Sequence, residues 1–118
     1  MRILIPALLI AAPAFAQDWN IYDGDVALSP EEIQSQVEGQ TLVFYDNGRS
    51  VFGADGGYSY TYDGGGTAVG TYTVEGDGVI CIDFENGWSR CDKYVRSGAR
   101  MILLTAKGER YPIRPKDG

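Results

Sequence analysis

The sequence predicts a mainly β fold: an antiparallel up-and-down meander of about eight short strands that closes into a small barrel and follows one short α-helix. Turn dipeptides such as Asn47-Gly48, Asp63-Gly64 and Asn86-Gly87 recur after residue 39 at about the spacing of a β-meander. Strand-like runs lie between these turns. Strands joined by short turns pair antiparallel with their chain neighbours, and a sheet built in this way curls and closes.

The predicted strands are, in chain order, residues 41–45, 50–53, 58–62, 68–74, 79–84, 88–95, 101–105 and 110–113. A helix is predicted before them, because Ser29 and Glu32 have the spacing of a capping box and Gly39 offers a helix end. Its apolar face consists of Ile33 and Val37. So short a helix is unstable alone, and we expect it to plug one end of the barrel or to cover an open edge.

The first residues predict export. A basic start at Arg2, an apolar run over residues 3–12 and a small-x-small site at Ala14 to Ala16 are typical of a secretory signal peptide. We therefore divide the chain into a signal peptide (1–16), an N-terminal extension (17–27), a helix-plus-barrel domain (28–113) and a C-terminal tail (114–118). The expected location is periplasmic or secreted.

The chain is acidic. Sixteen Asp and Glu face ten Lys and Arg, a formal net charge of −6 that becomes more negative when Arg2 is removed with the signal peptide. Such a surface repels nucleic acid and anionic lipid. We therefore expect no nucleic-acid partner. No stretch after the signal peptide is apolar enough to span a membrane, so we also expect no membrane insertion after signal removal, and we expect a monomer.

Cys81 and Cys91 predict a disulfide across a hairpin. If residues 85–87 form a three-residue loop centred on Asn86, Cys81 stands opposite Cys91 and Phe84 stands opposite Trp88. Such loops place their third residue in the left-handed region, where a glycine is found here. An exported chain is expected to oxidise this pair.

Aromatic side chains give the main signal for binding. Tyr58, Tyr60 and Tyr62 alternate along one strand, so their rings share one face. A turn centred on Gly65 would set Tyr58 opposite Tyr72. The tyrosines could line a pocket for a sugar, a lipid or an aromatic metabolite, or they could be cross-strand packing in a filled interior.

The disulfide hairpin poses the same question. One of its faces combines apolar residues with Trp88, Arg90 and Asp92. If that face is interior, Arg90 must be ion-paired, stacked on Trp88, or directed at an anionic ligand. The candidate ligand-binding residues are Tyr58, Tyr60, Tyr62, Tyr72, Trp88 and Arg90.

Residue types for catalysis are scarce. The sequence has no histidine, and both cysteines are expected in the disulfide, which leaves no usual catalytic triad and no common zinc ligand. Carboxylate pairs such as Asp83 with Glu85, or Asp23 with Asp25, are typical of solvated surface. Calcium could use Asp23 with Asp25, or Glu75 with Asp77, but neither cluster has the ligand count of a calcium loop. We expect no catalytic residue, no metal and no cofactor.

An ordered set of short motifs resembles a known family. The motifs are Leu28-Ser29-Pro30-Glu31-Glu32-Ile33, Gly39-Gln40-Thr41, Asp55-Gly56, Gly70-Thr71-Tyr72, Glu75-Gly76-Asp77, Cys81 and Arg90-Cys91. They are similar to small exported bacterial domains of unknown function, in which a helix precedes a lipocalin-like β-barrel with one disulfide hairpin; relatives often carry Trp at the position of Tyr72. The resemblance implies a fold and a periplasmic location, and no activity.

Two functional hypotheses follow. The first is a non-catalytic envelope domain that binds a small ligand or a partner through the barrel mouth and the tyrosine face. The alternative is protein recognition, as in a periplasmic protease inhibitor or an envelope assembly factor, with the 63–67 loop and the extended tails making contact. The partner is then an unknown small ligand or an envelope protein.

Overall fold

The structure is a computed structural model that describes residues 19–115. The predicted signal peptide and residues 116–118 of the predicted tail lie outside the described residues. The elements are β1 (Val26–Ala27), α1 (Pro30–Val37), β2 (Gln40–Val43), β3 (Arg49–Phe52), β4 (Gly57–Thr61), β5 (Thr67–Val74), β6 (Val79–Phe84), β7 (Ser89–Ser97), β8 (Arg100–Leu104) and β9 (Arg110–Pro112).

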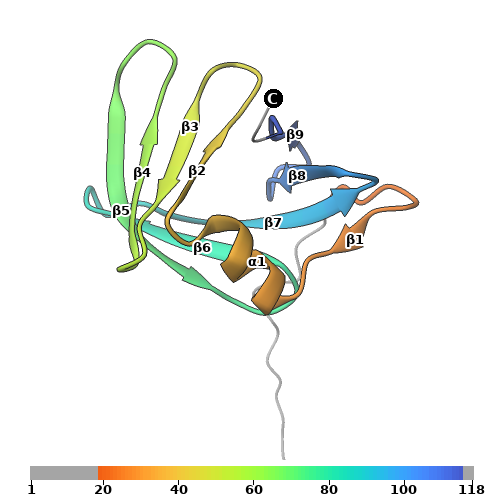
Figure 1. Ribbon diagram of the computed structural model, residues 1–118. Coiled ribbons are helices and arrows are strands. Elements are labelled where there is room, and N and C mark those ends of the chain that lie inside the picture. Colours follow the sequence, from red (N-terminus) through yellow and green to blue (C-terminus); the bar gives the residue numbers. More distant parts are fainter. Residues whose placement is uncertain (1–18, 116–118) are drawn as a thin grey trace, which may run out of the picture.

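Strands β2 to β9 form the predicted antiparallel meander, each paired with its chain neighbour. The sheet curls into a half-barrel (Figure 1), which confirms the predicted fold class. Its first and last strands meet at a single β-bridge between Phe44 and Ile113. Beside the bridge, the Arg114 N–H donates to the Val43 carbonyl at 2.8 Å. Elsewhere along this seam an open groove separates β2 from β8.

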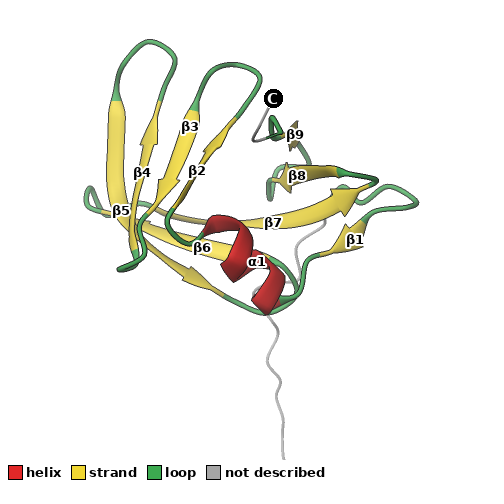
Figure 2. Ribbon diagram, in the orientation of Figure 1, coloured by secondary structure: helices red, strands yellow, loops and turns green. Residues whose placement is uncertain are grey.

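Helix α1 lies over one end of the half-barrel (Figure 2) and packs against β2 and β5. Its capping box is complete: the Ser29 hydroxyl accepts from the Glu32 N–H at 3.1 Å, and the Glu32 carboxylate accepts from the Ser29 N–H at 2.9 Å. Ile33 and Val37 are fully buried in the core. The helix therefore fills one end with apolar side chains, and we call this the closed end.

One type of turn recurs in five of the hairpins. The residue just before each three-residue loop donates its N–H to the carbonyl of the residue just after the loop. Its own carbonyl accepts a hydrogen bond from the N–H of the third loop residue. In the hairpin of the disulfide, Phe84 N donates to Trp88 O at 2.8 Å and Gly87 N donates to Phe84 O at 3.0 Å. The third loop residue has positive φ in every case. The loops are residues 45–47, 54–56, 63–65, 85–87 and 106–108.

The register of the disulfide hairpin is as predicted. Cys81 pairs with Cys91 and forms the disulfide, with the two Cα atoms 4.0 Å apart. Because Phe84 and Trp88 form a hydrogen-bonded pair, the cysteines three residues along occupy a non-hydrogen-bonded pair. Side chains approach more closely at such pairs, which suits a disulfide.

The predicted register of the tyrosine hairpin is wrong. Tyr58 stands opposite Gly70, and Tyr60 opposite Ala68. The prediction centred the turn on Gly65, whereas Gly65 is the third residue of a 63–65 loop and has φ of 103°. Tyr72 consequently lies nearer the closed end than the prediction placed it.

Residues 19–27 lie against the outside of the barrel. Strand β1, which the sequence did not predict, pairs with the second half of β7. Trp19 packs on an outer apolar cluster formed by Val95, Ile102 and Leu104. Arg110 joins this segment to β9 through an ion pair with Asp25 at 2.7 Å, with both side chains almost fully buried.

The same Arg110 makes two further contacts with the segment. Its guanidinium donates to the Asn20 carbonyl at 2.8 Å and lies 3.7 Å from the centre of the Tyr22 ring. The hydrogen bonds from Arg110 hold the pKa of Asp25 below its usual range, against the opposing effect of burial.

Reducing the disulfide should destabilise the protein by about 2 to 3 kcal/mol, because a closed loop of about ten residues restricts the unfolded chain. In a domain of this size that corresponds to a fall in Tm of roughly 10 °C or more. Thermal unfolding followed by circular dichroism, with and without reductant, measures the change. A Cys81→Ser/Cys91→Ser variant, insensitive to reductant, is the control. An unchanged Tm of the native protein under reductant would contradict the prediction.

The ionisation of Asp25 should make the free energy of unfolding depend on pH. Its lowered folded-state pKa means that its contribution is present above the unfolded pKa of about 4 and is lost as the pH falls through the lower folded value. Asp25→Asn should therefore be less stable than wild type at pH about 7, and the difference should shrink below pH about 4. Urea unfolding across this range measures it, with the exposed Asp23→Asn as control. A difference independent of pH would refute the assignment.

Candidate mouth site

The end of the half-barrel opposite α1 contains a cavity of about 230 Å³, which we call the mouth. Alternate hairpins of a meander lie at the same end, so the loops 45–47, 63–65, 85–87 and 106–108 surround it. The residues that line it are Phe44, Asp46, Ser50, Tyr58, Tyr60, Tyr62, Phe84, Arg90, Asp92, Leu103, Thr105, Glu109 and Tyr111.

Four of the six candidate ligand-binding residues meet in this cavity: Tyr58, Tyr60, Tyr62 and Arg90. The tyrosines run from depth to surface, since Tyr58 is 7% exposed and Tyr62 is 57% exposed. At the inner end the Tyr58 hydroxyl hydrogen-bonds the buried Ser50 hydroxyl at 2.9 Å. Towards the outside the Tyr60 and Tyr62 rings meet edge to face, with centroids 4.9 Å apart. The stripe is therefore core at one end and accessible at the other.

The other two candidates lie outside the mouth. Tyr72 is buried towards the closed end, where its hydroxyl donates to the Gly53 carbonyl at 2.9 Å and its ring meets the Phe52 ring edge to face. Trp88 is 74% exposed just after the 85–87 loop. The structure thus makes Tyr72 a packing residue and leaves the Trp88 ring in solvent.

Arg90 is ion-paired, the first of the three arrangements that the sequence allowed. Its guanidinium donates to both Asp92 oxygens, at 3.0 and 2.8 Å. The Asp92 side chain is 5% exposed, and burial raises its pKa despite the bonds from Arg90. For Arg90 burial acts to lower the pKa, but the hydrogen bonds and charge of Asp92 outweigh it, and the pKa rises. The pair fixes the arginine along the cavity wall.

Two acidic residues of the mouth were not predicted. Asp46 lies in the 45–47 loop, where one carboxylate oxygen accepts from the Gly48 N–H at 2.9 Å. Glu109 follows the 106–108 loop and accepts from the Thr105 hydroxyl at 3.0 Å. These loops belong to opposite ends of the meander and meet only because the sheet curls, so no local pattern in the sequence could have joined them.

Gly48 is a further residue that the sequence analysis missed. A Cβ atom at this position would overlap the Tyr60 hydroxyl, so the glycine makes the room that this ring occupies. Gly70, opposite Tyr58, instead accommodates the backbone of β6, because its Cβ would overlap the Asp83 carbonyl.

Environment raises the pKa of several mouth phenols. Burial raises the pKa of Tyr58 to about 12. The pKa of Tyr60 is raised by burial and then by the charge of Asp46, and that of Tyr111 by burial and then by Glu109. These phenols are neutral hydrogen-bonding groups at physiological pH.

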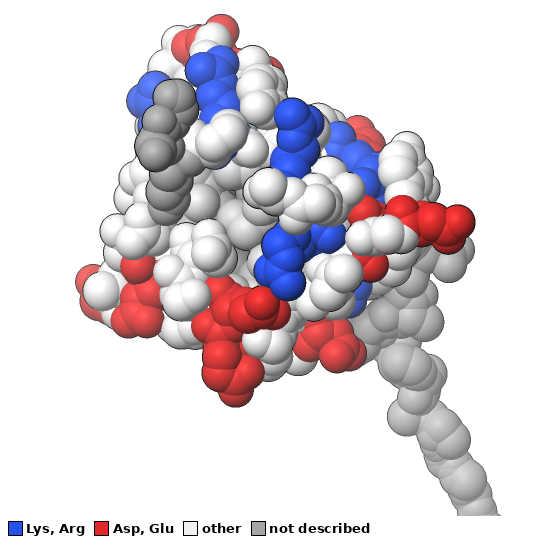
Figure 3. Space-filling view, turned by 45° about the vertical axis from the view of Figure 1, so that its right-hand side comes forward, with Lys and Arg blue, Asp and Glu red and all other residues white. Residues whose placement is uncertain are grey.

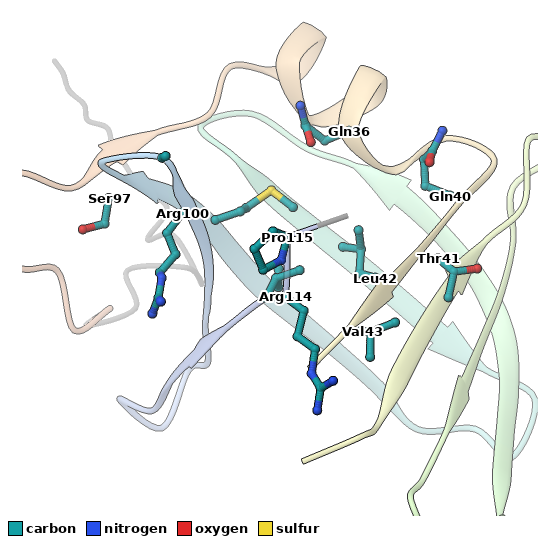
Figure 4. A pocket seen from close by; sticks show the side chains of 12 residues that line it. Gln36, Gln40, Thr41, Leu42, Val43, Ser97, Arg100, Arg114 and Pro115 are labelled. Carbon is teal, nitrogen blue, oxygen red and sulfur yellow. The ribbon is translucent and has the colours of Figure 1, made fainter. Parts of the chain in front are cut away.

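A larger cavity of about 770 Å³ lies at the seam between β2 and β8, outside the mouth. Figure 4 shows it between α1, β2 and the chain end, with Arg100 and Arg114 on one side and Gln36 on the other. Both arginines also lie near the Tyr45 ring, at 5.9 and 5.3 Å from its centre. On the face turned towards β8 and β9, Lys and Arg run through the middle while Asp and Glu cluster along the lower edge (Figure 3). The seam groove is thus locally basic in an acidic chain.

Within residues 19–115, no group of three or more His, Cys, Asp or Glu is placed to hold a metal ion. The same residues contain no helix long and apolar enough to cross a membrane. Comparisons of the chain with family models, with curated proteins and with solved structures find no match. The structure alone shows a small β half-barrel with one disulfide, consistent with a lipocalin-like fold.

Tyr58→Phe should lower the free energy of unfolding by about 1 to 2 kcal/mol, because it leaves the buried Ser50 hydroxyl without its partner. Adding Ser50→Ala should recover part of the loss, since both polar groups are then absent. Tyr62→Phe, at an exposed position, should change stability by less than about 0.5 kcal/mol. Urea unfolding of the four proteins tests this; equal losses from Tyr58→Phe and Tyr62→Phe would show that the hydrogen bond contributes nothing.

Proposed function

We propose that this protein is a non-catalytic binding domain that takes a small ligand in its mouth. The observation that carries the proposal is the contrast between the two ends of one barrel. The closed end is filled by apolar side chains from α1, whereas the mouth keeps an open cavity lined by phenols and charged groups. A concave site with aromatic walls and a few fixed polar groups is the usual form of a small-molecule site.

We further propose that the domain works in the periplasm and belongs with the small exported lipocalin-like domains that its motifs resemble. Three features support this: the signal-like first residues, the half-barrel with its single disulfide, and the capped helix that precedes it. A disulfide persists in oxidising compartments and is rare in the cytosol.

Recognition of a partner protein is the second candidate, and the seam groove favours it. There the β2 end of the sheet is joined to the β9 end by the Phe44–Ile113 bridge and the neighbouring hydrogen bond from Arg114 to Val43, and two arginines lie beside the groove. An exposed strand edge can pair with an extended segment of another chain. A contact role for the extended N-terminal segment has less support, because residues 19–27 pack on the barrel.

A fragment screen by two-dimensional NMR on the exported chain distinguishes the two candidates. Small ligands should shift the amide signals of the mouth loops. Tyr60→Ala should weaken the best fragment by roughly five- to tenfold, since an aromatic contact contributes about 1 kcal/mol. Gly48→Ala, which displaces the Tyr60 ring, should act in the same direction.

Tyr45→Ala is the matched control, because this exposed tyrosine faces the seam arginines and does not line the mouth. If Tyr45→Ala weakens binding and Tyr60→Ala does not, the seam is the binding site and the proposal fails. Unfolding measurements on each variant separate a lost contact from a lost fold.

A further inference from the structure

We infer that the ligand of the mouth is a small organic cation, an alkylammonium or methylated amine held between the carboxylates of Asp46 and Glu109 and the faces of the tyrosine rings. This inference rests on the proposed function and names the chemical class that the site accepts.

The charge balance of the mouth is the first argument. Arg90 is the one cation among its lining residues, and both of its hydrogen-bonded nitrogens are directed at Asp92. Neither Asp46 nor Glu109 forms an ion pair with any Lys or Arg of the described chain. Both residues are exposed, so water solvates their carboxylates in the free protein. The mouth therefore presents two carboxylates that no cation of the described residues pairs with, and a bound cation could pair with them.

These two carboxylates are fixed in place. Asp46 is held by the Gly48 N–H of its own turn, and Glu109 by the hydroxyl of Thr105, a residue that is buried. Each of these bonds engages one carboxylate oxygen, and Glu109 also hydrogen-bonds the Tyr111 phenol, which contributes to the raised pKa of that phenol. The two acidic residues come from the two ends of the meander, which meet at the Phe44–Ile113 bridge, so their carboxylates lie on neighbouring loops at the rim of the cavity.

Aromatic walls are the second argument. Six of the thirteen lining residues are Phe or Tyr, among them the accessible Tyr60, Tyr62 and Tyr111. The face of an aromatic ring attracts a cation, and proteins recognise quaternary ammonium groups with cages of several aromatic rings. A neutral sugar would use the rings but leave the carboxylates unpaired, and an anion would be repelled by them.

The pKa shifts of the mouth phenols agree with the presence of the two carboxylates beside them. After burial, the strongest influences on the pKa of Tyr60 and of Tyr111 are the nearby carboxylates Asp46 and Glu109, and both raise it; Arg90 opposes them less strongly. Both phenols therefore respond more strongly to these carboxylates than to Arg90.

The volume of the mouth limits the size of the cation that it can hold. At about 230 Å³ the mouth is smaller than the usual range of roughly 300 to 1,000 Å³ for drug-sized ligands. A compact ammonium group with a short alkyl chain fits such a volume. Calcium prefers six to eight oxygen ligands, which two carboxylates and a few hydroxyls do not provide.

The test uses three probes of similar size on the exported chain: tetramethylammonium, neutral tert-butanol and anionic pivalate, followed by NMR of the tyrosine rings and mouth amides. Tetramethylammonium should shift the Tyr60, Tyr62 and Tyr111 signals at the lowest concentration. Asp46→Asn and Glu109→Gln should each weaken it by about threefold or more, as for a partly exposed charge pair. Both substitutions keep the oxygen that accepts the local hydrogen bond.

Glu75→Gln is the control, because it removes the same charge from the exposed turn after β5, at the opposite end of the barrel. It should leave the affinity for tetramethylammonium unchanged. Equal weakening by Glu75→Gln would mean that only net charge matters, and would overturn the inference.

The remaining outcomes separate the inference from the proposed function. If tert-butanol or pivalate shifts the mouth signals as well as tetramethylammonium does, the cation inference fails while a mouth site for small ligands stands. If none of the three probes shifts the mouth, and the fragment screen also finds no ligand there, both fail.

Discussion

A hairpin turn that needs one residue of positive φ sets the register on which the rest of the structure depends. In a strand, successive side chains point to opposite faces, so the turn decides which residues enter the barrel. Gly87 places Ile82 and Arg90 inside and the disulfide outside. Gly65 does the same for the tyrosine strand, and Asn47 for the β2–β3 hairpin. The conformational free energy of a residue in the left-handed region is lowest when that residue is Gly or Asn. The register of each hairpin therefore depends on the identity of one residue in its loop.

The second consequence of this register is a division of the interior along the barrel axis. Alternate hairpins bring polar loop residues to one end, and the capped helix closes the other with Ile33 and Val37. On the inner face of β7, Arg90, Asp92 and Tyr94 follow this gradient inwards, from a half-exposed guanidinium to a phenol that is 1% exposed. The pKa of Tyr94 accordingly rises well above its ordinary value through burial.

The sequence predicted the structural features that depend on residues close together in the chain. The capping box at Ser29, the order of the strands and the register of Cys81 with Cys91 each depend on residues close in the chain, and all are confirmed. The predicted register of the tyrosine hairpin was wrong because the turn was centred on Gly65. In a three-residue loop the glycine is the third residue, as Gly65 and Gly87 both are in the structure. The features that the sequence did not predict depend on residues far apart in the chain. They are strand β1, the contacts of Arg110 with residues 20–25, and the presence of Asp46 and Glu109 in one cavity.

The composition of the mouth is not what stability alone would favour. Burying a charge such as that of Asp92 has a desolvation cost that its pairing with the half-exposed Arg90 offsets only in part, and well-packed apolar residues of similar volume are often equally or more stabilising. Ser50 and Asp92 stand at inward positions that, at the closed end, are taken by apolar side chains. The same barrel could therefore have been filled at both ends. Instead, one end keeps hydrogen-bonded polar groups around an open cavity, and this contrast supports the proposal that the mouth binds a ligand.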